Sequence, residues 1–264
     1  MKIGIIGLGA VGTANKKGFE SLGHEVVVHD IKLGTKVKDV LDTDVNFICV
    51  PTPANKDGSC DTSIVYQVIA QLCEYDYTGV ICVRSTVEPG FTDKVIRYFH
   101  NKNICFAPEF LRERCAEDDF INNHTLLAVG SLNHTVYKIV VEAHGDLPKN
   151  AVDLKPVEAE LLKYYNNVYA SLRVTFANVL YEVCKKLDAD YTKVKDSYIL
   201  TGKAKDMYLD VNDTTRGYAG MCLPKDTKAL IQLIKKLGLD YDLIDSIEND
   251  NNKFKKTVFR GMRK

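Results

Sequence analysis

Short hydrophobic runs recur along the first half of the chain. They occupy residues 1–7, 25–30, 45–50, 79–84, 103–107 and 125–130, and each is rich in Val and Ile. Such runs are typical of strands buried on both faces of a parallel sheet. Between them, residues 10–22, 62–73 and 91–100 have helical spacing, and Asp61 is a candidate N-cap for the second of these helices. The alternation predicts an α/β fold of the Rossmann type, with a doubly wound and largely parallel sheet.

The connection between the second and third predicted strands, residues 31–44, is unusually short. A βαβ crossover needs about a dozen residues. We therefore expect at most a stub of helix in this segment.

The strand and helix alternation stops near residues 153–156, where a long helix is predicted over 157–187. Apolar residues recur there in steps of three and four: Leu161, Tyr165, Val168, Leu172, Phe176, Val179, Val183 and Leu187. Further apolar residues lie elsewhere around the helix, so it needs burial on more than one face. The pattern predicts two domains, residues 1–153 and an all-helical part, residues 154–264, built on this central helix.

Two further helices are predicted at residues 191–201 and 223–237, joined by the polar loop 206–216. The tail, residues 249–264, is dense in Lys, Arg and Asn, and we expect it to fray.

Charge and composition narrow the function classes. The 35 basic residues balance the 35 acidic ones, so no net field attracts nucleic acid or an anionic membrane. No apolar run approaches the roughly 20 residues that span a bilayer, and residues 1–7 enter a strand without a signal peptide, which favours the cytoplasm. The eight cysteines show no CxxC pair and no metal-ligand cluster, so we expect mostly inert thiols and no metal.

A glycine fingerprint, Gly7-x-Gly9-x-x-Gly12, follows the first strand and opens the first helix. In this context the glycines serve a tight turn, the backbone approach to a pyrophosphate and helix packing. Asp30 ends the second strand, where a carboxylate accepts hydrogen bonds from ribose hydroxyls and repels a 2′-phosphate, so NAD is favoured over NADP. The predicted contacts of this loop are Gly7, Gly9, Ala10, Val11, Gly12 and Asp30.

Three other segments end predicted strands: residues 50–53, 84–90 and 108–113. Taken singly, each is consistent with turn chemistry, in which prolines end strands and hydroxyls cap helices. Ligands bind at the carboxyl ends of strands in open α/β sheets. All three segments share that edge with the glycine loop, which favours a common cleft.

Cys222 lies in a glycine-bracketed turn and is followed by Lys225 and Asp226. These are the surroundings of a reactive thiol, although a single cysteine is more often structural. A neighbouring carboxylate raises a thiol pKa, so thiolate formation has to rely on Lys163, Lys225 or backbone donors. Lys163 and Asn167 are four residues apart and share one face of the long helix.

Six motifs, in order, make the chain resemble the UDP-glucose/GDP-mannose dehydrogenase family. They are the glycine loop, Val50-Pro51-Thr52-Pro53, Ser85-Thr86-Val87, Pro108-Glu109-Phe110-Leu111-Arg112-Glu113, Glu160-Leu161-Leu162-Lys163-Tyr164-Tyr165-Asn166-Asn167 and Cys222-Leu223-Pro224-Lys225-Asp226. The resemblance spans almost the whole chain. It implies oxidation of a nucleotide sugar at C6 from alcohol to carboxylate with two NAD, with UDP-glucose favoured.

The resemblance also implies individual roles. Cys222 is the nucleophile that forms a thiohemiacetal and then a thioester, and Lys163 stabilises the oxyanion. A water near Thr86, Asp226 and Lys163 takes the first proton, and Glu109 activates the hydrolytic water. The implied catalytic residues are Cys222, Lys163, Asp226, Glu109, Thr86 and Asn167. Further cofactor contacts are implied at Pro51, Thr52, Ser85, Thr86, Glu113 and Lys225, and substrate contacts at Glu109, Leu111, Lys163, Asn167, Arg216, Gly217, Tyr218 and Gly220.

The sequence departs from the family pattern in three places. The family's third domain has no counterpart in these residues, the usual insertion after the second strand is missing, and Ala219 replaces a glycine before the cysteine. A methyl group at position 219 would crowd a backbone approach to the sugar. We expect a homodimer that buries Val168, Leu172 and Phe176 and places Arg216 near the substrate diphosphate.

Two alternative functions stay open at this point. A two-electron hydroxyacid or phosphogluconate-type dehydrogenase also uses a helix-borne lysine but does not need Cys222. An NAD-binding regulatory protein would keep the cofactor site without turnover.

Overall fold

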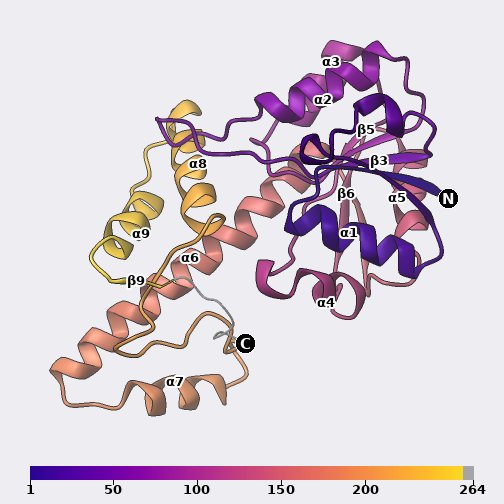
Figure 1. Cartoon of the computed structure of the whole chain (residues 1–264). Helices are drawn as coiled ribbons and strands as arrows, with labels where there is room; N and C mark the ends of the chain where they lie inside the picture. Colours follow the sequence, from indigo (N-terminus) through magenta and orange to yellow (C-terminus); the bar gives the residue numbers. More distant parts are fainter. Residues whose placement is uncertain (258–264) are drawn as a thin grey trace. The chain divides into compact units, whose positions relative to one another are not determined.

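The structure, a computed structural model, describes residues 1–257, which fall into two compact units (Figure 1). The first unit comprises Met1–Asn55 and Cys60–Lys163, and the second comprises Lys56–Ser59 and the chain from Tyr164 onward. The assignment of separate functions to residues 1–153 and 154–264 stays a prediction.

The first unit contains a mostly parallel sheet of seven strands, counted over residues 1–257. They are β1 (Lys2–Ile6), β2 (Glu25–His29), β3 (Val45–Ile48), β4 (Val80–Val83), β5 (Ile104–Phe106), β6 (Leu127–Gly130) and β7 (Ala151–Leu154). Their order is β2-β1-β3-β4-β5-β6-β7, and every neighbouring pair is parallel except β5 and β6. The predicted Rossmann-type sheet is confirmed. The sequence pattern does not predict β7, an edge strand on which Val152 and Asp153 are exposed.

Helices cover both faces of this sheet. They are α1 (Ala10–Ser21), α2 (Ser63–Glu74), α3 (Phe91–Phe99), α4 (Ala116–Ile121) and α5 (His134–His144), with a 3-10 turn, η3, at Glu113–Cys115. One core joins α1, α4 and α5 to strand residues such as Ile3, Ile5 and Phe47. The other joins α2 and α3 to alternate strand residues such as Ile48 and Ile81. Side chains of successive strand residues therefore enter opposite layers, as a doubly wound sheet requires.

Two 3-10 turns, η1 (Ile31–Leu33) and η2 (Val37–Val40), make up the short crossover after β2. The expectation of at most a stub of helix is confirmed. The helices predicted at residues 10–22, 62–73 and 91–100 are confirmed as α1, α2 and α3. The sequence pattern does not predict α4 or α5.

The long helix, α6 (Pro156–Lys186), agrees with the prediction for residues 157–187, and the chain passes from the first unit to the second inside it. The second unit also contains α7 (Tyr191–Ile199), α8 (Leu223–Lys236), α9 (Leu243–Asn251) and the short parallel pair β8 (Gly217–Tyr218) and β9 (Lys256–Thr257). No helix within the described part of the chain is both long and apolar enough to cross a membrane.

Two small cores hold the second unit together. One joins α6 to α7 and the following loop through Ala177, Cys184, Tyr191, Leu209 and Val211. The other joins Val174 of α6 to Tyr218 and Ile247. Within the unit, Gly58 lies against α8, where an added Cβ would stand 3.3 Å from Lys228 Cβ. The predicted fraying is wrong for residues 249–251, which end α9, and for 256–257, which form β9; residues 258–264 lie outside the described range.

Candidate active site

The glycine loop between β1 and α1 has one open position flanked by two crowded ones. Gly7 has φ +96°, and a Cβ there would lie 2.8 Å from the Cys49 carbonyl oxygen; at Gly12 a Cβ would lie 1.9 Å from the Gly7 carbonyl oxygen. A Cβ at Gly9 would meet nothing within 4 Å. Gly9 is also the N-cap of α1 and provides no side-chain cap. The loop thus leaves room for a ligand at the helix N-terminus, where N–H groups favour an anion.

Asp30 is held beside this loop by two backbone donors. The Leu8 N–H donates to Oδ2 at 2.7 Å, and the Lys32 N–H donates to Oδ1 at 2.8 Å. These hydrogen bonds, from Leu8 first and Lys32 second, lower the pKa of the Asp30 carboxyl. The side chain is therefore an ionised acceptor next to the open side of the glycine loop.

Ile31 and Leu33 follow Asp30 in η1, and both are largely exposed. The sequence pattern assigns them no role, although both directly follow Asp30, the residue predicted to bind a ribose. Unlike Val37 and Val40 of the same crossover, which are buried, their side chains face solvent. A flat apolar group such as an adenine could cover them.

The loop after β4 is fastened at its start by Ser85. The Ser85 hydroxyl donates to the Val50 carbonyl oxygen at 2.7 Å and approaches the Ile48 carbonyl oxygen at 3.2 Å. Ser85 is buried, so its hydroxyl joins the ends of β3 and β4 rather than facing a ligand. Thr86, next in the loop, is half-buried.

Glu109 is buried at the end of β5 and forms an ion pair with the buried guanidinium of Arg84. Its carboxylate also accepts hydrogen bonds from Asn15 Nδ2 at 3.3 Å and from the N–H groups of Phe110 at 2.9 Å and Leu111 at 3.3 Å. Burial raises the pKa of this carboxyl, but Arg84 outweighs burial and leaves the pKa below its usual range. Glu109 is therefore ionised, and its carboxylate is held by an ion pair and three hydrogen bonds.

Arg84 has a second buried partner in His144. The guanidinium Nη1 lies 3.3 Å from His144 Nε2, while His144 Nδ1 lies 2.7 Å from the Val140 carbonyl oxygen. This arrangement assigns the proton to Nδ1, which donates to the carbonyl, and leaves Nε2 to accept from Arg84. Burial, together with Arg84, lowers the pKa of His144 well below its ordinary value, so the ring is neutral.

Lys163 belongs to the same unit and reaches the same segment. Its Nζ donates to the main-chain carbonyl oxygen of Glu109 and lies 5.8 Å from the centroid of the Phe110 ring. The structure thus brings together two predicted catalytic residues, Lys163 and Glu109. Lys163 contacts the backbone carbonyl of Glu109, while the Glu109 carboxylate forms its ion pair with Arg84.

In the second unit, Asp226 is buried and contacts two other predicted site residues. Asn167 Nδ2 donates to Asp226 Oδ2 at 2.5 Å, and Lys225 Nζ pairs with Asp226 Oδ1 at 2.7 Å. Cys222 stands four residues earlier at the N-cap of α8 and is exposed, whereas the other seven cysteines within residues 1–257 are buried or half-buried. The structure therefore gathers Asn167, Lys225 and Asp226 close to an exposed thiol at a helix N-terminus.

Arg216 does not have the surroundings predicted for a diphosphate ligand. Its Nε donates to Asn178 Oδ1 at 2.9 Å, it forms an ion pair with Glu182, and its guanidinium lies over the Tyr181 ring at 4.8 Å. All three partners belong to α6. The side chain is buried and engaged with this helix, and its predicted role at the substrate stays a prediction.

The turn before Cys222 is packed at one end and open at the other. A Cβ on Gly217 would lie 2.6 Å from Asn251 Oδ1, and Tyr218 is fully buried with its hydroxyl 2.9 Å from Glu248 Oε2. Gly220 has φ +89°, and a Cβ there would meet nothing within 4 Å. Gly217 and Tyr218 are tightly packed, and Gly220 has open space beside it; the substrate contacts predicted at all three stay predictions.

The remaining predicted contacts lie at the surface or just below it. Ala10, Pro51 and Glu113 are exposed, and Val11, Thr52 and Leu111 are half-buried.

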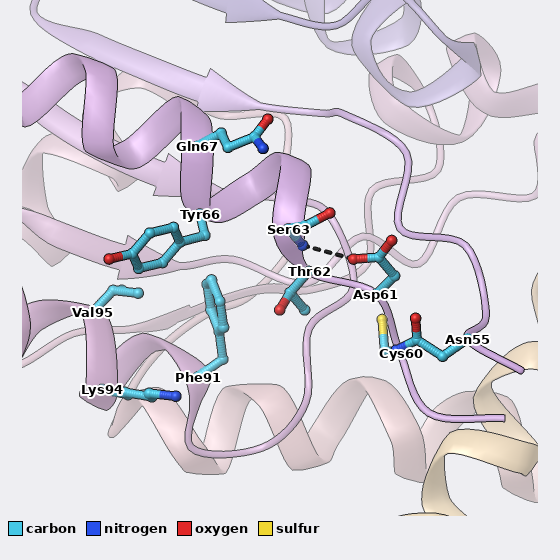
Figure 2. A pocket seen from close by; sticks show the side chains of 10 residues that line it. All are labelled: Asn55, Cys60, Asp61, Thr62, Ser63, Tyr66, Gln67, Phe91, Lys94 and Val95. Carbon is cyan, nitrogen blue, oxygen red and sulfur yellow. Dashed lines mark hydrogen bonds between the residues drawn. The ribbon is translucent and has the colours of Figure 1, made fainter. Parts of the chain in front are cut away.

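A separate hollow of about 500 Å³ lies in the first unit, next to the N-terminal turns of α2 and α3 (Figure 2). Phe91, Lys94 and Val95 of α3 line it together with residues at the start of α2, and the Asp61 carboxylate accepts a hydrogen bond from the Ser63 N–H at 2.9 Å. None of the predicted site residues lines this hollow.

Comparison with known proteins places these observations in context. Residues 31–146 match the NAD binding domain of the UDP-glucose/GDP-mannose dehydrogenase family, and residues 157–253 match its central domain. The UDP-glucose 6-dehydrogenase AglM of Haloferax volcanii is 28% identical over 96% of this chain and 70% of its own length. The GDP-mannose 6-dehydrogenase of Pseudomonas aeruginosa is 27% identical over 96% of this chain and 68% of its own length.

Among solved structures, a UDP-glucose dehydrogenase from Pyrobaculum islandicum superimposes with a TM-score of 0.86 and 26% identity, covering 96% of this chain and 68% of that one. The chain spans between 49% and 70% of the length of the curated relatives compared with it.

Proposed function

The chain belongs to the UDP-glucose/GDP-mannose dehydrogenase family, and on that basis we propose that it oxidises the C6 alcohol of a nucleotide sugar to a carboxylate with two NAD. UDP-glucose, giving UDP-glucuronate, is the favoured substrate. The observation that carries the proposal is the exposed Cys222 at the start of α8, next to an Asp226 that Asn167 and Lys225 hold in place. The gene product would act in the cytoplasm.

The first unit has the features that an NAD site needs. The open space at Gly9 accommodates a pyrophosphate, Asp30 offers its carboxylate to ribose hydroxyls, and Ile31 and Leu33 offer an apolar surface to the adenine. A bound NAD would supply the hydride acceptor for each of the two oxidations at C6.

Cys222 accounts for the second oxidation. An aldehyde carbon has one C–H bond and no hydroxyl, so addition of the Cys222 sulfur converts it into a thiohemiacetal that again carries both. Loss of the second hydride then gives a thioester. Water cleaves the thioester to the acid and returns the thiol.

We assign Lys163 to charge stabilisation, because its ammonium can face the oxygen that becomes negative during the addition. Asn167 orients Asp226 and the sugar, and Thr86 contributes a hydroxyl for the first proton transfer. For Glu109 we propose a role different from the one implied by the resemblance. Its pKa is held low by Arg84, which makes it a weak base, and its backbone carbonyl orients Lys163.

Counting products tests the proposed function. UDP- and GDP-sugars are supplied with NAD, and NADH and sugar acid are both quantified. Two NADH per acid support the four-electron mechanism. One NADH per oxidised molecule would instead support a two-electron hydroxyacid-type dehydrogenase, and tight NAD binding without any turnover would support a regulatory protein.

We predict that Asp30→Ala weakens NAD binding by about ten- to a hundredfold while changing NADP binding much less. The lost hydrogen bonds to a charged acceptor are worth about 1.5 to 3 kcal/mol, and the lost charge no longer repels a 2′-phosphate. Calorimetric titration measures both affinities. Asp42→Ala, which removes an exposed carboxylate of the same unit paired with Lys2, is the control. Equal affinity of the unaltered protein for the two cofactors would refute this role of Asp30.

A stripe of exposed apolar residues on α6 supports the proposed homodimer. Tyr165 is 71% exposed and Phe176 is 56% exposed. Tyr169, Val179 and Val183 continue the stripe at helical spacing. Val168, which we expected at the interface, is only 5% exposed, so little of its side chain is available for a dimer contact.

We predict that the protein sediments as a dimer at micromolar concentration and that Phe176→Glu shifts it to a monomer, because a buried carboxylate at the contact is unpaired. Val194→Glu, at an exposed apolar position of α7, is the matched control and should leave the dimer intact. A monomeric unaltered protein would contradict the proposed interface.

A further inference from the structure

A buried carboxylate near the start of α6 has no part in the chemistry proposed so far. Glu160 is 0% exposed. Its Oε2 accepts a hydrogen bond from the Gly90 N–H at 2.5 Å, and its Oε1 accepts one from the Thr92 N–H at 2.8 Å. Both donors lie at the N-terminus of α3, about 70 residues earlier in the chain.

These contacts supply a cap that α3 does not have locally. Its N-cap residue, Gly90, has φ +95° and no side chain that could accept a hydrogen bond from the first turn. The first N–H groups of a helix need acceptors from outside the helix. Glu160 provides them from α6, so the two helices are joined through one carboxylate.

The hydrogen bonds of Glu160 connect two segments that take part in the proposed reaction, the β4–α3 loop and the start of α6. The loop that carries Thr86 starts at Ser85, which is hydrogen-bonded to Ile48 at the end of β3, and it ends at Gly90, which is hydrogen-bonded to Glu160. Lys163 follows Glu160 by three residues on α6, so the two side chains project from neighbouring positions of successive turns. A shift of α6 at Glu160 would move Lys163 relative to Thr86.

We propose that Glu160 is a positioning residue, whose carboxylate clamps α6 to the end of the β4–α3 loop and so fixes Lys163 relative to Thr86. The catalytic part of this inference rests on the proposed function. The clamp itself does not, because it is a property of the first unit.

The clamp needs two acceptor oxygens, and a carboxylate has them. Burial, and to a smaller extent Asp93 at the first turn of α3, outweigh the lowering effect of the hydrogen bonds from Thr92 and Gly90 and raise the pKa of Glu160 to about 7. A protonated carboxyl turns a hydroxyl donor toward one of the N–H groups. The clamp is therefore complete above pH 7 and loses one hydrogen bond below it.

Glu160→Gln tests the proposal, since it keeps the shape of the side chain but sets an amide NH₂ against one of the N–H groups. We expect kcat to fall about tenfold with the KM for NAD unchanged, and the substrate deuterium isotope effect at C6 to rise as hydride transfer becomes limiting. The rise of kcat with pH through about 7 in the unaltered protein should disappear. Glu158→Gln, two residues earlier on α6, is the control. A Glu160→Gln variant with the kinetics and pH profile of the control would overturn the proposal.

Two measurements do not depend on turnover. In the unaltered protein, hydrogen exchange at the Gly90 and Thr92 amides should slow as the pH rises past 7, after correction for the intrinsic exchange rate, and acylation of Lys163 should change in rate in Glu160→Gln. If no nucleotide sugar is oxidised, the proposed function fails while these measurements still decide the clamp. Unprotected amides in the unaltered protein at pH 8 would rule the clamp out even if the variant does not fold.

Discussion

Replacing Cys222 by Ser is expected to stop turnover and to leave oxidised sugar bound to the protein as an ester. A serine hydroxyl can add to the aldehyde, but its ester hydrolyses far more slowly than a thioester, because an alkoxide is the poorer leaving group. We expect kcat to fall by at least about a thousandfold. Intact-protein mass measurement after incubation with NAD and substrate should show the added sugar.

Cys222→Ala completes the comparison, because it removes the nucleophile altogether. It should form one NADH per sugar and release or retain the aldehyde, with no covalent adduct. Cys73→Ser, at a half-buried cysteine near the end of α2, is the control and should keep the stoichiometry of two NADH. If Cys222→Ser turns over normally with no adduct, Cys222 is a structural thiol and the four-electron mechanism fails.

Removing the charge of Arg84 is expected to destabilise the first unit strongly. Arg84→Met leaves the Glu109 carboxylate buried without its cation, and breaking a buried ion pair from one side costs about 3 to 5 kcal/mol. It also removes the donor that faces His144. Urea unfolding, with hydrogen exchange of the β4 amides as a local measure, gives the change in free energy of unfolding.

The double variant Arg84→Met with Glu109→Gln should recover a substantial part of that loss, because no buried charge then remains. Lys185→Met, which breaks the exposed pair with Asp213, should cost less than about 1 kcal/mol. Costs that simply add in the double variant would show that the pair is not coupled.

Glu109→Gln alone separates the two roles considered for Glu109. A hydrolytic base predicts that thioester accumulates in this variant, whereas a residue that contacts Lys163 through its backbone carbonyl, which the substitution keeps, predicts no accumulated adduct. The buried, ion-paired carboxylate favours the second result.

Elements with strong local patterns were predictable from the sequence. Strands β1 and β3 to β6 are buried and mostly apolar, the edge strand β2 still contains three consecutive Val residues, and α6 has the length and spacing of a long helix. The edge strand β7 lacks such a run, because water covers part of it. The signal for α5 was present, since Val136, Val140 and Ala143 are spaced four and three residues apart and face the core. By contrast, α9 is polar over most of its length, so composition alone suggested a frayed tail.

In the candidate site too, some features were predictable from local sequence and others were not. The glycine loop and Asp30 follow from local order, because a strand, a tight turn and a helix fix the relative positions of these residues. The partners of Glu109 and Arg216 do not follow from it. Arg84 lies 25 residues before Glu109, and Glu182 lies 34 residues before Arg216, so each pairing depends on how distant elements pack. The sequence places Arg216 next to the glycine-bracketed turn, which suggested a phosphate ligand. The fold shows an ion pair between Arg216 and Glu182, which the sequence order does not indicate.

The segment Lys56–Ser59 has a practical consequence for dissecting this protein. It lies early in the chain, yet it packs as part of the second unit, with Gly58 against Lys228. A fragment ending at residue 163 would contain residues 56–59 without the α8 surface on which they pack. A fragment starting at residue 164 would expose that surface to solvent. The two units are thus interleaved along the chain. A separable first unit calls for a shortened connection between Asn55 and Cys60, and a stable second unit calls for residues 56–59 grafted back beside α8.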